Sequence, residues 1–123
     1  MKIIRWETEI SDYNLDFVSL IDQTPPIFKV ATDSGALFEV IMEPGIVGPY
    51  VIADEEHLTN YWVIIKSIEK KIGSTFIIEP SNLASRFEIL VDSELYKHYV
   101  VATSSSCLEV LSIEPPEIRR GQK

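Results

Sequence analysis

The chain has 123 residues, of which 46 % are hydrophobic, and it carries one cysteine and a formal net charge of −8. This length suits one domain with its own core, and a lone cysteine excludes an internal disulfide and favours a reducing compartment. The apolar stretches are far shorter than the roughly 20 residues that span a bilayer, and the first ten residues lack the apolar run of a secretory signal. The sequence therefore predicts a soluble cytoplasmic protein.

The negative charge is concentrated in the first half of the chain. Residues 1–60 contain eleven acids and three bases, whereas residues 61–123 contain eight of each. Such a field repels nucleic-acid phosphates and anionic lipid, and it speeds encounter with basic proteins. A net negative charge also serves solubility alone, so this second interpretation stays open.

Two segments precede the first proline pair. Residues 2–10 alternate between apolar and charged side chains, which predicts a half-buried strand. Residues 12–22 fit either a helical stripe behind a Ser11 cap or a strand in which Tyr13, Leu15 and Phe17 alternate. We favour a short helix here, which Pro25 and Pro26 then end.

Residues 27–43 predict a β-hairpin. The turn sequence Asp33-Ser34-Gly35 separates two runs rich in Phe, Val and Ile, and Gly35 would take a positive φ. Glu39 would point away from the core.

Residues 55–72 predict the main helix, because apolar residues recur there at the spacing of one buried face. Asp54 suits the N-cap, Glu55 and Glu56 suit the positive end of the helix dipole, and Gly73 suits the C-terminal stop. Consecutive helical residues point about 100° apart, so these acids and His57 cannot converge on one metal ion. We expect neither a metal nor a cofactor.

The remaining chain predicts an antiparallel meander. Strands are expected within 74–79, 86–92, 94–103 and 107–114, followed by an extended or flexible tail over 115–123. The predicted fold class is therefore α+β over residues 1–114. It consists of a mainly antiparallel or mixed sheet of about six or seven short strands, with the 55–72 helix packed on one face.

The leading functional hypothesis is a non-catalytic module that docks a basic protein. Its composition is similar to that of bacterial immunity or antitoxin proteins, which inhibit basic nuclease-like toxins; the analogy rests on no motif. Charged contacts would steer the partner and tyrosines would anchor it. The candidate residues are Glu39, Glu43, Asp54, Glu55, Glu56, Tyr13, Tyr50 and Tyr61.

Two alternatives remain open. The first is a small-molecule pocket or small enzyme between sheet and helix, formed by Tyr96, His98, Tyr99 and Cys107. We favour instead a half-exposed strand face at His98 and an inert packed thiol at Cys107. The second alternative is a subunit that self-associates through exposed strand edges.

Overall fold

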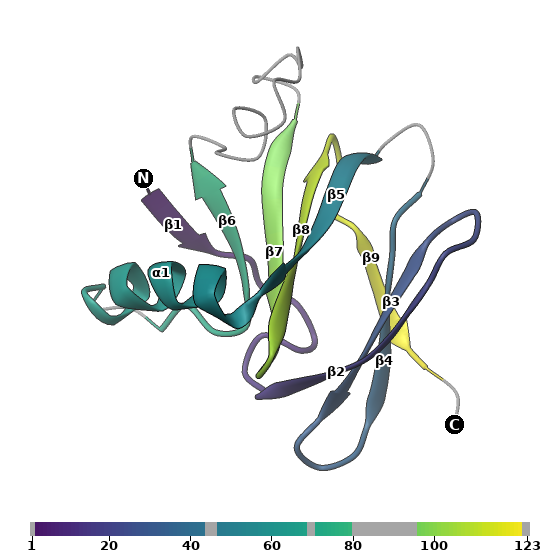
Figure 1. The fold of residues 1–123 in the computed structure, drawn as a ribbon, viewed down its shortest axis with the longest axis horizontal. Coiled ribbons are helices and arrows are strands. Elements are labelled where there is room, and N and C mark those ends of the chain that lie inside the picture. Colours follow the sequence, from purple (N-terminus) through teal and green to yellow (C-terminus); the bar gives the residue numbers. More distant parts are fainter. Residues whose placement is uncertain (1, 44–46, 69–70, 80–95, 122–123) are drawn as a thin grey trace.

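The computed structural model describes residues 2–43, 47–68, 71–79 and 96–121, and its chain trace is shown in Figure 1. These residues form nine strands and one helix. In chain order they are β1 (Lys2–Arg5), β2 (Leu15–Ile21), β3 (Ile27–Thr32), β4 (Leu37–Ile41), β5 (Val47–Asp54), α1 (Glu55–Lys66), β6 (Thr75–Glu79), β7 (Lys97–Ala102), β8 (Ser106–Ser112) and β9 (Glu117–Arg120).

The strands form two antiparallel sheets. The five-stranded sheet has the order β1-β6-β7-β8-β5, and the four-stranded sheet has the order β2-β3-β4-β9. In Figure 1 the smaller sheet lies on one side of the larger one, and α1 lies on the other side. The expected antiparallel, β-rich character of the fold is confirmed. The expectation of one sheet with a main helix laid across it is wrong, because a second sheet takes that principal packing role.

The central strands β7 and β8 are buried on both faces, as their nearly continuous apolar sequences require. Tyr99 and Val101 on β7 contribute to the core shared with the second sheet, where Phe28 and Val30 of β3 are fully buried. The alternate residue Val100 belongs to a second core, which includes Cys107 of β8 and Tyr61 of α1.

The predicted helix over 12–22 is wrong, because Leu15–Ile21 forms strand β2 and pairs with β3. A bulge between Phe17 and Ser19 shifts the register of β2 by one residue. This shift puts apolar residues out of strict alternation, and the result imitates a helical stripe.

The helix begins as predicted but is shorter than predicted, since α1 ends at Lys66 and not at residue 72. The amides of Ser67 and Ile68 bond carbonyls three residues earlier, and the Ser67 hydroxyl also bonds the Ile64 carbonyl. This tightened last turn closes the helix. Gly73 is therefore not its C-terminal stop.

The hairpin at 27–43 is confirmed: β3 pairs with β4, and Gly35 has a φ of 86°. The strand expected over 2–10 is shorter, ending at Arg5. Residues 86–92, where a strand was expected, lie outside the described residues. In the segment expected to be a tail, Glu117–Arg120 forms β9 and pairs with β4 at the sheet edge.

Candidate functional site

A groove with a volume of about 650 Å³ opens beside the start of β2. Its walls come from the start of β2, the β3–β4 turn, α1, the segment after α1 and the β7–β8 turn. Three carboxylates, two aromatic rings and one lysine give the groove its chemical character: Asp12, Asp16, Asp33, Tyr13, Trp62 and Lys71.

Buried hydroxyl groups hold the loop before β2 in place. The hydroxyl oxygens of Ser11 and Thr75 lie 2.7 Å apart, and both lie within hydrogen-bond distance of the Trp6 carbonyl oxygen, at 2.9 and 2.6 Å. The Ser74 hydroxyl donates to the Ile10 carbonyl at 2.7 Å. These hydrogen bonds join the loop before β2 to the start of β6, and Ser11 and Ser74 also line the groove.

Gly73 allows the segment after α1 to approach this loop. Its φ is +84°, and a Cβ at this position would lie 2.3 Å from the Ser11 carbonyl oxygen. Both the backbone conformation and the close approach require glycine. The residue is important for the groove wall, and its predicted role at the helix end is replaced by this one.

The three groove carboxylates differ in their surroundings. Asp12 accepts from Arg5 Nη2 at 3.0 Å and pairs with Lys71 Nζ at 3.2 Å. The hydrogen bond from Lys71, followed by that from Arg5, holds the pKa of Asp12 below its usual value. Asp16 accepts from the Ser104 hydroxyl at 2.7 Å, and Asp33 is exposed on the β3–β4 turn. Asp12 is paired with cations, so the negative field of the groove comes from Asp16 and Asp33.

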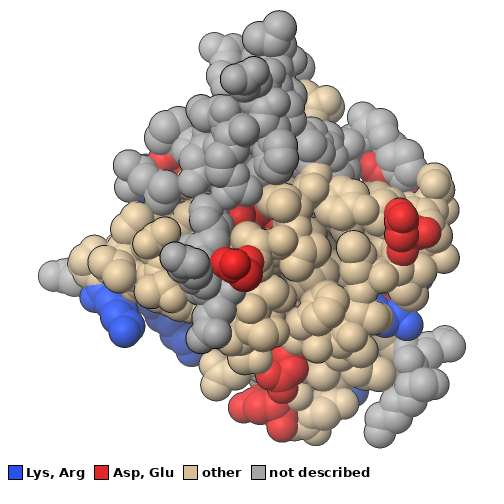
Figure 2. Space-filling model, in the orientation of Figure 1, with Lys and Arg blue, Asp and Glu red and all other residues tan. Residues whose placement is uncertain are grey.

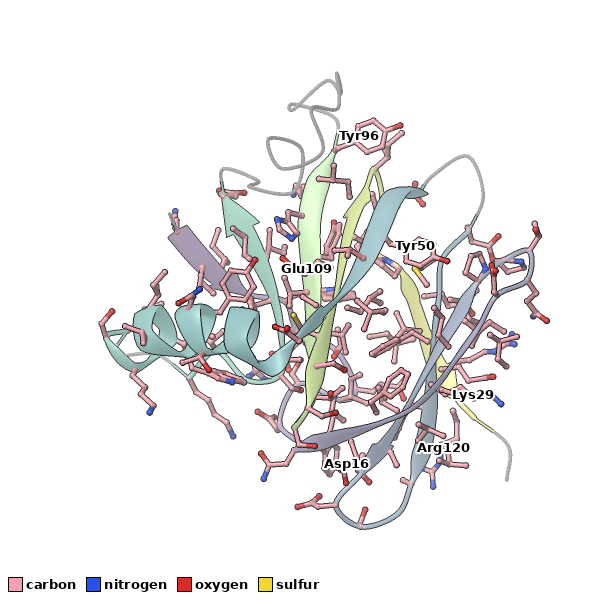
Figure 3. The ribbon with its side chains drawn as sticks, viewed as in Figure 1. Asp16, Lys29, Tyr50, Tyr96, Glu109 and Arg120 are labelled. Atoms are coloured by element: carbon pink, nitrogen blue, oxygen red, sulfur yellow. The ribbon has the colours of Figure 1, made fainter. Side chains whose placement is uncertain are left out.

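A second polar group is buried between α1 and the larger sheet, and we call it the Glu109 cluster: Tyr61, His98, Cys107 and Glu109. The Tyr61 hydroxyl donates to Glu109 Oε1, and His98 Nε2 lies 3.0 Å from the same oxygen. Cys107 Sγ lies 3.9 Å from Glu109 Oε2. Figure 3 shows Glu109 in the middle of the molecule, beside the central strands.

Burial determines what the Glu109 cluster can do. His98, Cys107 and Glu109 have no exposed surface, and Tyr61 is 1 % exposed. A buried carboxylate is tolerated only where donors compensate its lost hydration, and here donors come from α1, β7 and β8 itself. The arrangement joins the helix to the sheet. Its acid, base and thiol groups lie together but are sealed from substrate-sized molecules in this structure.

The residues of the alternative pocket are only partly brought together. His98 and Cys107 meet through Glu109, whereas Tyr99 belongs to the core on the opposite face of the sheet. Figure 3 shows Tyr96 at one end of β7, away from Glu109. The expectation of a half-exposed strand face at His98 is wrong, because β7 is covered on both faces.

The candidate partner-binding acids do not gather in one place. Glu39, on β4, is ion-paired with Lys29 at 3.8 Å and with Arg119 at 3.3 Å. Glu43 is exposed in a second groove, while Asp54 is exposed at the end of β5. The side chains of Glu55 and Glu56 lie outside the described residues. Figure 2 shows the acidic side chains of one face as separate groups, not one continuous patch.

The three candidate tyrosine anchors differ in their exposure to solvent. Tyr13 is 45 % exposed and lines the acidic groove. Tyr50 packs against the core between the two sheets, as Figure 3 also shows, and Tyr61 is buried in the Glu109 cluster. Tyr61 is therefore wrong as a surface anchor, whereas Tyr50 keeps a partly exposed side chain and its role stays a prediction.

Sequence reasoning missed the groove residues Asp12, Asp16, Asp33 and Trp62 as members of one site, because they come from three segments that are distant in sequence. It also missed Glu109, for which a signal exists. Glu109 is the single charge within "CLEVLS", and an acid inside a strand that is apolar on both faces points to a buried, partnered carboxylate.

Comparison with protein-family models, with curated proteins and with solved structures gave no match for this chain. Within the described residues, no three histidine, cysteine or acidic side chains are grouped so as to hold a metal ion. The helix that the structure describes is too short to cross a membrane. The site must therefore be interpreted from its own chemistry.

Proposed function

We propose that this protein is a small binding module that docks a basic protein partner in the acidic groove. The single observation that supports this proposal is the convergence of Asp12, Asp16 and Asp33 on one concave surface with Tyr13 and Trp62. Carboxylates orient arginine or lysine through charge-assisted hydrogen bonds, and aromatic faces attract the same cations.

The charge of the whole chain supports the same partner class. A net charge of −8 accelerates encounter with a cationic protein and opposes binding to nucleic acid or anionic lipid. An immunity- or antitoxin-type inhibitor of a basic toxin is a function of this kind, and basic toxins are the partners to test first.

Hexa-arginine peptide is a suitable first probe, with tryptophan emission as the readout. Trp62 lines the groove, whereas Trp6 is buried in the core, so a Trp62→Phe variant separates the two signals. We expect the peptide to change the emission of Trp62, and we expect the affinity to fall steeply as salt rises.

Two double variants with the same change in net charge test whether the peptide binds in the acidic groove. Asp16→Asn/Asp33→Asn and Glu43→Gln/Glu114→Gln change the net charge equally, but the second pair lies in another groove, of about 210 Å³. We expect the first pair to weaken peptide binding about tenfold and the second to change it less than about twofold. Equal effects would show that only net charge matters and would contradict the proposal.

The natural partner is best sought by capture from the source cell. The unmodified protein and the Asp16→Asn/Asp33→Asn variant serve as parallel baits. A basic protein that is retained by the first bait and lost from the second would support the groove as its docking site.

A further inference from the structure

The outer edge of β2 continues away from the acidic groove. β2 stands at the end of its sheet, and among the described strands it pairs with β3 alone. At its first residue, the Leu15 carbonyl accepts the backbone amide of Ser104 at 2.8 Å. This bond shows that the edge already accepts a backbone partner at its beginning. Residues 17–21 extend the same edge beyond that turn.

Exposed apolar side chains gather at the same place. Five large apolar residues are exposed among those the structure describes, and three of them lie within six positions: Tyr13 at 45 %, Phe17 at 38 % and Val18 at 47 %. The β2 bulge accounts for two consecutive exposed residues, because it interrupts the alternation. The Phe17 ring is supported from below by Phe28, at 5.3 Å between centroids.

We propose that the partner docks through an extended cationic segment that pairs with residues 17–21 of β2 while its basic side chains occupy the acidic groove. This inference rests on the proposed function and specifies how the partner binds. Strand addition supplies backbone hydrogen bonds, and side chains at alternate positions supply specificity. Phe17 and Val18 would receive apolar side chains of the segment, next to Asp16, which would receive a basic one.

Charge complementarity opposes the other occupants of this edge. A second copy of the chain that paired antiparallel over residues 17–21 would set Asp16 opposite Asp22, and like charges directly opposite each other are destabilising. Nucleic acid and anionic membranes carry the same sign as the groove. A segment that alternates basic and apolar residues matches both halves of the surface.

Three synthetic peptides separate strand pairing from simple charge attraction. The first alternates lysine and valine over eight residues, the second is hexa-lysine, and the third is the first peptide with alternate backbone amides methylated. We expect the alternating peptide to bind about tenfold more tightly than hexa-lysine and to protect amides of residues 17–21 from hydrogen exchange. Methylation should remove both effects.

Variants of the protein complete the test. We expect Val18→Ser to weaken the alternating peptide about fivefold and to leave hexa-lysine unchanged. Val63→Ser is the matched control, because Val63 is 66 % exposed on α1. Circular dichroism verifies that both variants fold.

The outcomes distinguish this inference from the proposed function. One outcome is that Asp16→Asn/Asp33→Asn weakens hexa-lysine binding while Val18→Ser and amide methylation leave the affinity of the alternating peptide unchanged. That result would support the groove as the binding site and show that strand pairing is wrong. If none of the peptides binds, both proposals are wrong. Self-association of the protein through β2, detected by light scattering, would contradict the inference as well.

Discussion

Glu109 lies between α1 and the larger sheet with no exposed surface, whereas Asp16 opens onto solvent at the start of β2. Glu109 faces a tyrosine hydroxyl, a histidine nitrogen and a thiol. Asp16 accepts a hydrogen bond from the exposed Ser104 hydroxyl. Figure 3 labels both residues, and it shows them in different parts of the molecule.

This difference shows that an acidic side chain can serve either the fold or the surface of this protein. A carboxylate without access to water costs free energy unless its donors are complete, so Glu109 makes α1 and the sheet depend on each other. A carboxylate in a groove costs folding little, and its field remains available to a partner. The sequence composition counts both kinds of acid equally.

The largest expected loss of stability follows from substitution of Glu109. We expect Glu109→Ala to lower the free energy of unfolding by about 3–5 kcal/mol, because it removes a buried group that contacts Tyr61 of α1 and His98 of β7. Urea denaturation followed by circular dichroism measures the loss. Glu114→Ala, at an exposed acid, should change stability by less than about 0.5 kcal/mol. Similar losses of stability in the two variants would show that the buried Glu109 matters no more for folding than an exposed acid.

Removal of one donor should have a smaller effect. Tyr61→Phe keeps the ring, which packs against Phe76 at 5.9 Å between centroids, and removes the hydroxyl that donates to Glu109. We expect a loss of about 1–3 kcal/mol in the same measurement. Tyr13→Phe, at an exposed ring, is the control and should be nearly neutral. A neutral Tyr61→Phe would show that Glu109 does not depend on this donor.

The groove carboxylates should matter little for folding. We expect Asp16→Asn/Asp33→Asn to change the free energy of unfolding by less than about 0.5 kcal/mol, because exposed charges contribute little to stability. Thermal unfolding checks this expectation. A large loss of stability would make Asp16 and Asp33 structural residues, and it would remove the contrast with Glu109.

The smallest expected effect is a change in the pKa of Asp12, which lines the groove. The pKa of Asp12 is lowered from its ordinary value of 3.8, first by Lys71 and then by Arg5. When the pKa of a carboxyl group is lower in the folded state, the group stabilises the fold at pH values above its ordinary pKa. This contribution disappears as the pH falls through the lowered pKa. We expect Lys71→Ala to raise the pKa of Asp12, measured by NMR titration of its carboxyl carbon. Lys66→Ala, at an exposed lysine on α1, should leave it unchanged.

Local sequence signals predicted some elements correctly, because those elements depend on residues a few positions apart. The 27–43 hairpin follows from Asp33-Ser34-Gly35, and the start of α1 follows from Asp54 at the N-cap. The end of α1 and the identity of β2 did not follow. The first is set by the tightened turn at Ser67 and Ile68, and the second depends on pairing with β3.

The sequence by itself determined that the chain is β-rich and acidic and that its main helix begins after residue 54. Only the tertiary structure decided which acids share a surface and which one is buried. Asp12, Asp33, Trp62 and Ser104 meet because two sheets and the segment after α1 converge there. The physical reason is that a groove and a buried acidic side chain are properties of distant segments in contact, and no local pattern records which segments will meet.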